Sequence, residues 1–343
     1  MVPRSFFLSA TRPQLGSTRC EWVGTTIKPD LARFRYMAIR QRKKRDWFDR
    51  GAAAYALERT ERRGEPVYPC PICLKLFTVD ALGDGRLSSE HVPPESVGGR
   101  ELVLTCKRCN NSAGAKLDAD AATKELVRSA IAGTREHRER VKALVGDLCV
   151  NAEVQLSGGK YSLVVPHHVN KPGAADDLKA VVRPGSSIAV QYRRFSELGA
   201  KISWLRAGYL AMFAVSGYAF ALDPAMEIVR RQIIQCDERQ VVTFTSEVSD
   251  DIALAVHRIL RVRAPDWHRG WAVEFGRYFV HFPSAGDMDF YDRMAASGSA
   301  VTPYMTTYEY VGWPTEPTFG LAAPTGETSS DRCVIRWPGM ADI

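Results

Sequence analysis

Four cysteines stand in two closely spaced pairs on either side of a Glu-His dipeptide, Glu90-His91. The pairs are Cys70 with Cys73, and Cys106 with Cys109. Two Cys-x-x-Cys units supply the four thiolates that hold a structural Zn²⁺ ion tetrahedrally, and a disulfide is the alternative use of such cysteines. The 32 residues between the pairs exceed the roughly 15–20 of compact four-cysteine sites, which leaves room for a hairpin carrying the dipeptide. We therefore predict a structural zinc ion beside Glu90 and His91.

Residues 70 to about 118 resemble the HNH endonuclease module, in the branch with two zinc-binding cysteine pairs. The resemblance rests on Glu-His-x-x-Pro-Glu-Ser-x-Gly-Gly from Glu90, on Leu-x-Cys-x-x-Cys-Asn-Asn from Leu104, and on Gly114 and Asp118. It covers about a seventh of the chain. It implies a ββα-metal fold, with strands at about 86–91 and 102–105 and a helix that begins near Lys107.

The resemblance implies a metal-dependent endonuclease that hydrolyses DNA and leaves 5′-phosphate ends. His91 would be the general base, because an imidazole titrates near neutral pH and can accept a proton from water. Glu90 and Asn110 would hold Mg²⁺ or Mn²⁺ through oxygen ligands. The expected catalytic residues are therefore His91, Glu90 and Asn110, with the zinc site fixing the position of Asn110.

Two residues near this site have open roles. Glu101 stands where the family usually has Asn, so it either hydrogen-bonds the second imidazole nitrogen of His91 or faces solvent. Asp118 is either a supporting group of the site or a charge on a helix surface. Glu90 itself is one methylene longer than the Asp that is common before the His.

Positive charge is concentrated at the N-terminus. Residues 1–66 carry 15 Lys and Arg against 7 Asp and Glu, a net charge of +8, whereas residues 67–343 carry a net charge of −1. We expect a basic helix over about 38–63 that binds nucleic acid, with double-stranded DNA as the partner. The alternative is a solvated surface helix. The residues expected to contact nucleic acid are Arg40, Arg42, Lys43, Lys44, Arg45, Lys107 and Arg108.

Composition favours a globular protein of the reducing cytoplasm. Apolar residues make up 45% of the chain, and the four remaining cysteines are scattered rather than paired. The N-terminal segment lacks a hydrophobic stretch of export-signal length. The most apolar segment, 202–222, contains Arg206 and falls short of the roughly 20 apolar residues of a spanning helix, so we expect a buried helix and no membrane span.

The chain is predicted to be an α+β protein in three parts. These are a basic arm and helix over 1–66, the zinc-stabilised ββα-metal module with following helices over 67–150, and a separate C-terminal α+β domain over 151–343. Helix is expected from 111 to about 145, and short strands near 153–156, 161–165, 188–192, 241–244 and 277–282. From about residue 297 the sequence indicates an irregular tail.

A second function remains open from the sequence. The cysteine module could be a catalytically inactive zinc ribbon that binds nucleic acid or serves as an adaptor. The C-terminal domain is the expected site of a sensor, of self-association or of a partner. By analogy with fused nucleases, we expect a role in bacterial defence.

Overall fold

The computed structural model describes residues 31–59, 64–113, 117–131, 137–157, 160–182, 188–191, 195–236, 244–248, 256–297 and 307–321. The chain divides into two compact units, Met1–Arg40 and Gln41–Ile343. All contacts described below lie within the second unit. Helices and strands are mixed throughout it, which confirms the predicted α+β class.

The basic helix is present as α1 (Leu31–Glu58), so it begins and ends earlier than the sequence indicates. In its second half Trp47, Phe48 and Tyr55 are buried. Phe48 stacks on Tyr68 with ring centroids 5.9 Å apart. The helix is therefore more than a solvated surface element, because one face belongs to the core.

The predicted ββα arrangement is confirmed. Strand β1 (Tyr68–Pro69) pairs with β2 (Leu76–Phe77), and the short helix α2 (Asp80–Gly83) follows. Strands β3 (Leu87–Val92) and β4 (Arg100–Cys106) form an antiparallel hairpin whose connection includes the 3-10 turn η1 (Glu95–Val97). Helix α3 (Lys107–Ala113) starts directly after β4.

Residues 137–145 are a strand, so the expectation of helix up to 145 is wrong beyond α4 (Ala119–Ile131). Strand β5 (His137–Val145) alternates exposed and buried side chains along 140–143, and Gly146, at φ +57°, lies in the two-residue turn to the next strand. This alternation and a two-residue Gly-Asp turn favour a hairpin over helix.

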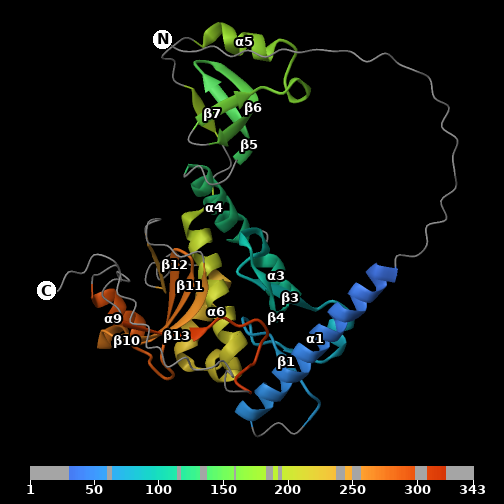
Figure 1. Cartoon of the computed structure of the whole chain (residues 1–343), viewed down its shortest axis with the longest axis vertical. Helices are drawn as coiled ribbons and strands as arrows, with labels where there is room; N and C mark the ends of the chain where they lie inside the picture. The colour runs from blue at the N-terminus through green and yellow to red at the C-terminus, as the bar shows by residue number, and fades with distance from the viewer. Residues whose placement is uncertain are drawn as a thin grey trace. The chain divides into compact units, whose positions relative to one another are not determined.

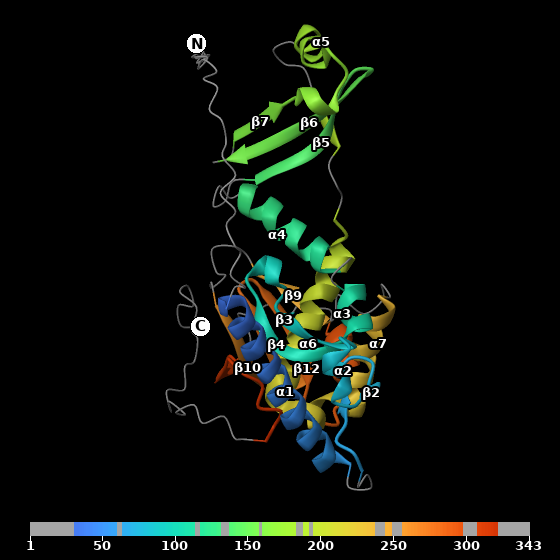
Figure 2. The same ribbon diagram turned by 90° about the vertical axis from the view of Figure 1, so that its right-hand side faces the viewer.

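Four strands form the sheet that begins with β5. Its order is β7-β6-β5-β8, with every pair antiparallel. Strands β7, β6 and β5 lie side by side in Figure 2. The other strands are β6 (Leu148–Ser157), β7 (Lys160–Val164) and β8 (Ala189–Gln191), which agree with three predicted strands. The 3-10 turn η3 (His167–Val169) and helix α5 (Ala174–Val181) lie between β7 and β8 in sequence.

The C-terminal region is built on helix α6 (Glu197–Ala221) and a five-stranded antiparallel sheet (Figure 1). The strand order is β13-β10-β11-β12-β9. The strands are β9 (Thr245–Glu247), β10 (His257–Ala264), β11 (Gly270–Phe275), β12 (Tyr278–Pro283) and β13 (Thr307–Gly312). The remaining elements are η4 (Pro224–Met226), α7 (Glu227–Gln235), η5 (Asp266–His268) and α9 (Phe290–Ala296).

Three expectations for this region have different outcomes. The strand predicted at 277–282 is confirmed as β12. The strand predicted at 241–244 falls mostly outside the described residues. Strand β13 lies in the segment expected to be irregular, and it pairs with β10 through two register shifts. A strand with such irregular pairing shows only a weak two-residue alternation of apolar and polar side chains in its sequence.

Helix α6 is the centre of the core, as its apolar sequence predicts. Most of its residues are buried, and Gly208 lies so close to β12 that a Cβ atom there would be 2.9 Å from Val280. Glycine is needed at Gly208 because the helix and the sheet approach each other closely. Within the described ranges, no helix combines the length and the apolar content needed to cross a bilayer.

Candidate metal centre

The four cysteine sulfurs form one cluster. Their Sγ atoms all lie within 4.8 Å of one another. The Sγ atoms of Cys73 and Cys106 are 3.7 Å apart. Zn–S bonds of about 2.3 Å in a tetrahedron place neighbouring sulfurs about 3.8 Å apart. The cluster therefore has the donor atoms and the spacing of a structural zinc site.

The turn between Cys70 and Cys73 is held from outside by helix α6. Tyr209 donates a hydrogen bond of 2.8 Å to the carbonyl oxygen of Pro71, and Tyr218 donates one of 2.5 Å to that of Pro69. Both tyrosines are buried. Burial is the main cause that raises the pKa of each phenol, so both remain hydrogen-bond donors at neutral pH. The second half of the chain thus fixes the first cysteine pair.

The Gly-Gly pair of the motif shapes the connection between β3 and β4. Gly98 has φ +90°, which favours glycine. A Cβ atom on Gly99 would lie 1.5 Å from the carbonyl oxygen of Pro93. Both positions therefore favour glycine, because the loop folds back onto Pro93.

His91 lies near the end of β3 with its side chain 29% exposed. Its Nε2 atom is 3.9 Å from Oε2 of Glu95, an exposed residue one short turn further on. A register shift between Glu90 and His91 pairs His91 with Glu101 on β4. The Glu101 carboxylate accepts a hydrogen bond of 2.7 Å from Ser89, so it contributes to the hairpin that presents His91.

Glu90 is buried and ion-paired. Its side chain is 5% exposed, and its Oε2 atom lies 2.8 Å from Nη2 of Arg206 on α6. Thr105 donates a hydrogen bond of 3.1 Å to the same oxygen. Arg206 is 3% exposed, and its Nη1 atom lies 3.7 Å from Oδ2 of Asp118. Although burial alone would lower the pKa of Arg206, the Coulombic attraction of Glu90 and then of Asp118 raises it.

Asn110 is fixed against β3. Its Nδ2 atom donates to Oγ of Ser88 at 3.0 Å and to the carbonyl oxygen of Ser89 at 3.3 Å. Because the amide nitrogen makes both bonds, the amide oxygen is the atom that can bind a cation. Asn110 directly follows Cys109, so the cysteine cluster and the hairpin together set its position. The described contacts join Asn110 to the strand of Glu90 and His91, but they do not join the three side chains directly.

Residues 70–126 match the sequence profile of the HNH endonuclease family. The chain therefore carries an HNH module. The match contains all four cysteines as well as Glu90, His91 and Asn110. No curated protein and no solved structure matches the chain.

Arg206 is the residue of this site that sequence reasoning missed. It lies outside the HNH module, on a helix whose apolar pattern indicates only a core role. The sequence signal for this role is an arginine within an apolar segment, because a buried arginine requires a carboxylate partner. Asp118, whose role was open, has a supporting position. Its Oδ1 atom accepts a hydrogen bond of 2.7 Å from Ser203, in addition to the contact with Arg206.

The predicted nucleic-acid contacts do not form one cluster of unpaired charges. Lys43 lies 3.2 Å from Glu316, and Arg45 pairs with Asp49 at 3.0 Å. Lys107 and Arg108 are exposed at the start of α3, directly beside the HNH module's second cysteine pair. Arg42 and Lys44 also lie on α1, and Arg40 belongs to the first unit. The role of all seven in binding stays a prediction.

Proposed function

We propose that the HNH module is the active site of a metal-dependent endonuclease that hydrolyses DNA. The observation that carries this proposal is the position of Asn110. It follows a cysteine of the cluster and is hydrogen-bonded to the strand that bears Glu90 and His91. A structural metal site thus supports the place where an imidazole and two oxygen ligands would act.

His91 is the general base in this proposal. A partly exposed imidazole on a strand end can reach a water molecule and, while neutral, accept its proton as the water attacks the phosphate. The pairing of His91 with Glu101 and the Gly98-Gly99 loop fix the backbone that carries the imidazole.

Glu90 and Asn110 are the proposed ligands of Mg²⁺ or Mn²⁺. Because Arg206 and Thr105 both contact Oε2 of Glu90, we assign Oε1 to the cation, together with the amide oxygen of Asn110. A bound divalent cation polarises the phosphate and stabilises negative charge on the leaving 3′ oxygen. Arg206 would hold the Glu90 carboxylate in a fixed orientation for this role.

One observation favours a second function, a catalytically inactive nucleic-acid-binding module. The charge of Glu90 is already neutralised by a buried arginine, which weakens the attraction of a carboxylate for a cation. This alternative predicts DNA binding that falls steeply with salt and no cleavage that depends on a divalent cation. In either case the zinc thiolates suit a reducing cytoplasm, and defence against foreign DNA is the biological role that we propose by analogy.

The test is incubation of the purified, zinc-containing protein with supercoiled plasmid in Mg²⁺, in Mn²⁺ and in EDTA. We expect nicked circles only with the divalent cations, and ends that DNA ligase reseals because they carry 5′ phosphates. If folded protein binds the plasmid but does not nick it, the nuclease function is ruled out and the binding module is the function that is supported.

A further inference from the structure

The four-stranded sheet of β5 to β8 has two chemically different faces. On one face Val141 and Ala143 of β5, with Val150 and Ala152 of β6, pack in a hydrophobic cluster that includes Leu178 of α5. The sheet therefore has a small core of its own on the side that α5 covers.

The opposite face carries a row of cations along β5. Arg138, Arg140 and Lys142 alternate with the buried residues and are all exposed. Alternate residues of a strand lie about 6.7 Å apart, a separation comparable with that of successive phosphates along one nucleic-acid strand. In the part of the chain that the structure describes, none of these three cations takes part in an ion pair. Their charge is thus available to a ligand.

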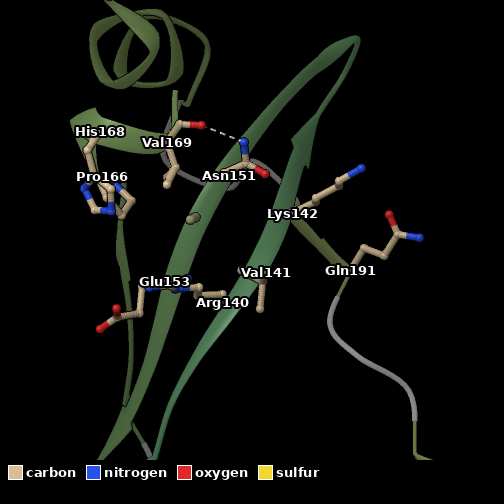
Figure 3. A pocket seen from close by; sticks show the side chains of 10 residues that line it. Arg140, Val141, Lys142, Asn151, Glu153, Pro166, His168, Val169 and Gln191 are labelled. Carbon is tan, nitrogen blue, oxygen red and sulfur yellow. Dashed lines mark hydrogen bonds between the residues drawn. The ribbon is translucent and has the colours of Figure 1, made fainter. Parts of the chain in front are cut away.

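The row borders a pocket of about 430 Å³. In Figure 3, Lys142 and Gln191 lie at one side of this hollow, Arg140 and Glu153 at its lower end, and His168 opposite Lys142. Glu153 is the only carboxylate among the described lining residues, and it accepts a hydrogen bond of 3.3 Å from Gln155. None of the described lining residues is Phe, Tyr or Trp. The pocket therefore offers mainly positive charge and amide donors.

Hydrogen bonds hold the rim of the pocket in place. Asn170 accepts a bond of 2.8 Å from the backbone nitrogen of Asn151 and donates one of 2.7 Å to its carbonyl oxygen. The Asn151 side chain donates a bond of 2.9 Å to the carbonyl oxygen of Val169. Asn170 thus takes the place of a paired strand, so the segment that follows β7 forms a fixed wall.

We propose that this outward face binds the phosphodiester backbone of nucleic acid, as a contact separate from the cleavage site. Arg140 and Lys142 bind phosphate oxygens, and the amides of Asn151 and Gln191 donate to the backbone. The contact is independent of base sequence, because its donors meet phosphates and not base edges. The inference rests on the proposed function for the identity of the ligand, since an HNH module acts on nucleic acid.

The experiment measures the affinity of the full-length protein for a fluorescent 30-bp DNA duplex in EDTA, at several salt concentrations. The test variant is Arg140→Gln/Lys142→Gln. The matched control is Lys171→Gln/Lys179→Gln, which removes the same charge from lysines that pair with Asp177 and Asp176 in and near α5. We expect the test variant to lose at least about tenfold in affinity at 0.1 M salt. The logarithm of the association constant decreases with the logarithm of the salt concentration, and we expect this slope to be less steep by about 2 in the test variant. The control should bind like the native protein.

Three outcomes would overturn the inference: no binding by the native protein, an unchanged affinity in the test variant, or an equal loss in both variants. The variant Arg140→Lys/Lys142→Arg retains the charge and should bind like the native protein, whereas a loss as large as that of the glutamine variant would also count against backbone binding. Plasmid nicking by the native protein in Mn²⁺ is scored separately. If binding depends on this face but the native protein does not nick the plasmid, the nuclease function is rejected. The inference that this face binds nucleic acid then still holds.

Discussion

Arg206 reaches from α6 into the HNH module, where its Nη2 atom lies 2.8 Å from Oε2 of Glu90. Both side chains are almost fully buried; Thr105 also contacts Glu90, and Asp118 also contacts Arg206. A residue of the C-terminal region thus forms a buried ion pair with a proposed metal ligand. The HNH module and α6 are therefore energetically coupled.

Replacement of Arg206 by Met should destabilise the protein by about 3–5 kcal/mol, because it leaves the charge of Glu90 buried without a partner. Chemical denaturation of the zinc-bound protein measures the change. The double variant Arg206→Met/Glu90→Gln should recover part of the loss, since it removes the unpaired charge. Arg263→Met is the control, because the Arg263–Glu309 pair is exposed and should contribute about 1 kcal/mol or less. Equal effects of Arg206→Met and Arg263→Met would contradict the coupling.

Native protein should contain one zinc ion per chain, and Cys109→Ser should lose it together with the folded hairpin. Metal analysis and circular dichroism measure both effects. Cys149→Ser is the control, because Cys149 is an exposed cysteine outside the cluster. A Cys109→Ser protein that stays well folded and still cleaves DNA would show that the cluster does not organise the site.

Gly99→Ala should destabilise the β3–β4 hairpin by roughly 1–3 kcal/mol or more, because the added Cβ atom would lie 1.5 Å from the Pro93 carbonyl oxygen. Gly83→Ala is the matched control, since a Cβ atom at Gly83 meets nothing within 4 Å. Thermal unfolding in excess zinc compares the two. If the variants melt at the same temperature, the close approach at Gly99 is not required.

Acid should destabilise the protein through two buried histidines on the C-terminal sheet. His268 Nε2 and His281 Nδ1 lie 3.0 Å apart, and His281 Nε2 is 3.0 Å from Oγ of Ser246. Burial lowers the pKa of His268 to about 4, and burial followed by repulsion from His268 lowers the pKa of His281 well below its ordinary value. Since both pKa values are depressed in the folded state, the unfolded state binds more protons as pH falls below about 6.5. The free energy of unfolding should then decrease by up to about 1.4 kcal/mol per pH unit for each histidine, down to about pH 4 for His268.

The histidine contribution is measured from denaturation between pH 7.5 and 5 in native protein and in His268→Gln. The variant should show a shallower loss of stability with acid, whereas His168→Gln, which changes an exposed histidine, should not. Zinc release by acid contributes to all three proteins alike, so the difference between slopes is the quantity that matters. Identical slopes in native protein and His268→Gln would contradict the buried neutral pair.

The HNH module was predictable from sequence because its signals are local. Cys106, Cys109 and Asn110 stand in one short segment, and the Gly98-Gly99 pair marks the turn of the hairpin, so strands β3 and β4 and helix α3 follow from the motif. Arg206 could not be assigned in the same way, because its partner Glu90 lies far away in sequence and only the packing of α6 joins them. Strand β5 was missed because its Arg, Glu and Lys residues are good helix formers and continue the composition of α4. Its alternation of charged and apolar residues is the signal that indicates a strand.

The single-turnover rate of plasmid nicking in Mn²⁺ tests the role of His91 most directly, with native protein, His91→Ala and His167→Ala compared at equal zinc content. Loss of a general base should lower the rate about 10²- to 10⁴-fold in His91→Ala. The control His167→Ala changes an exposed histidine that does not line the pocket, so it should nick like native protein, and all three proteins should bind DNA equally. Nicking by His91→Ala at the native rate would contradict the assignment of the HNH hairpin as the catalytic site.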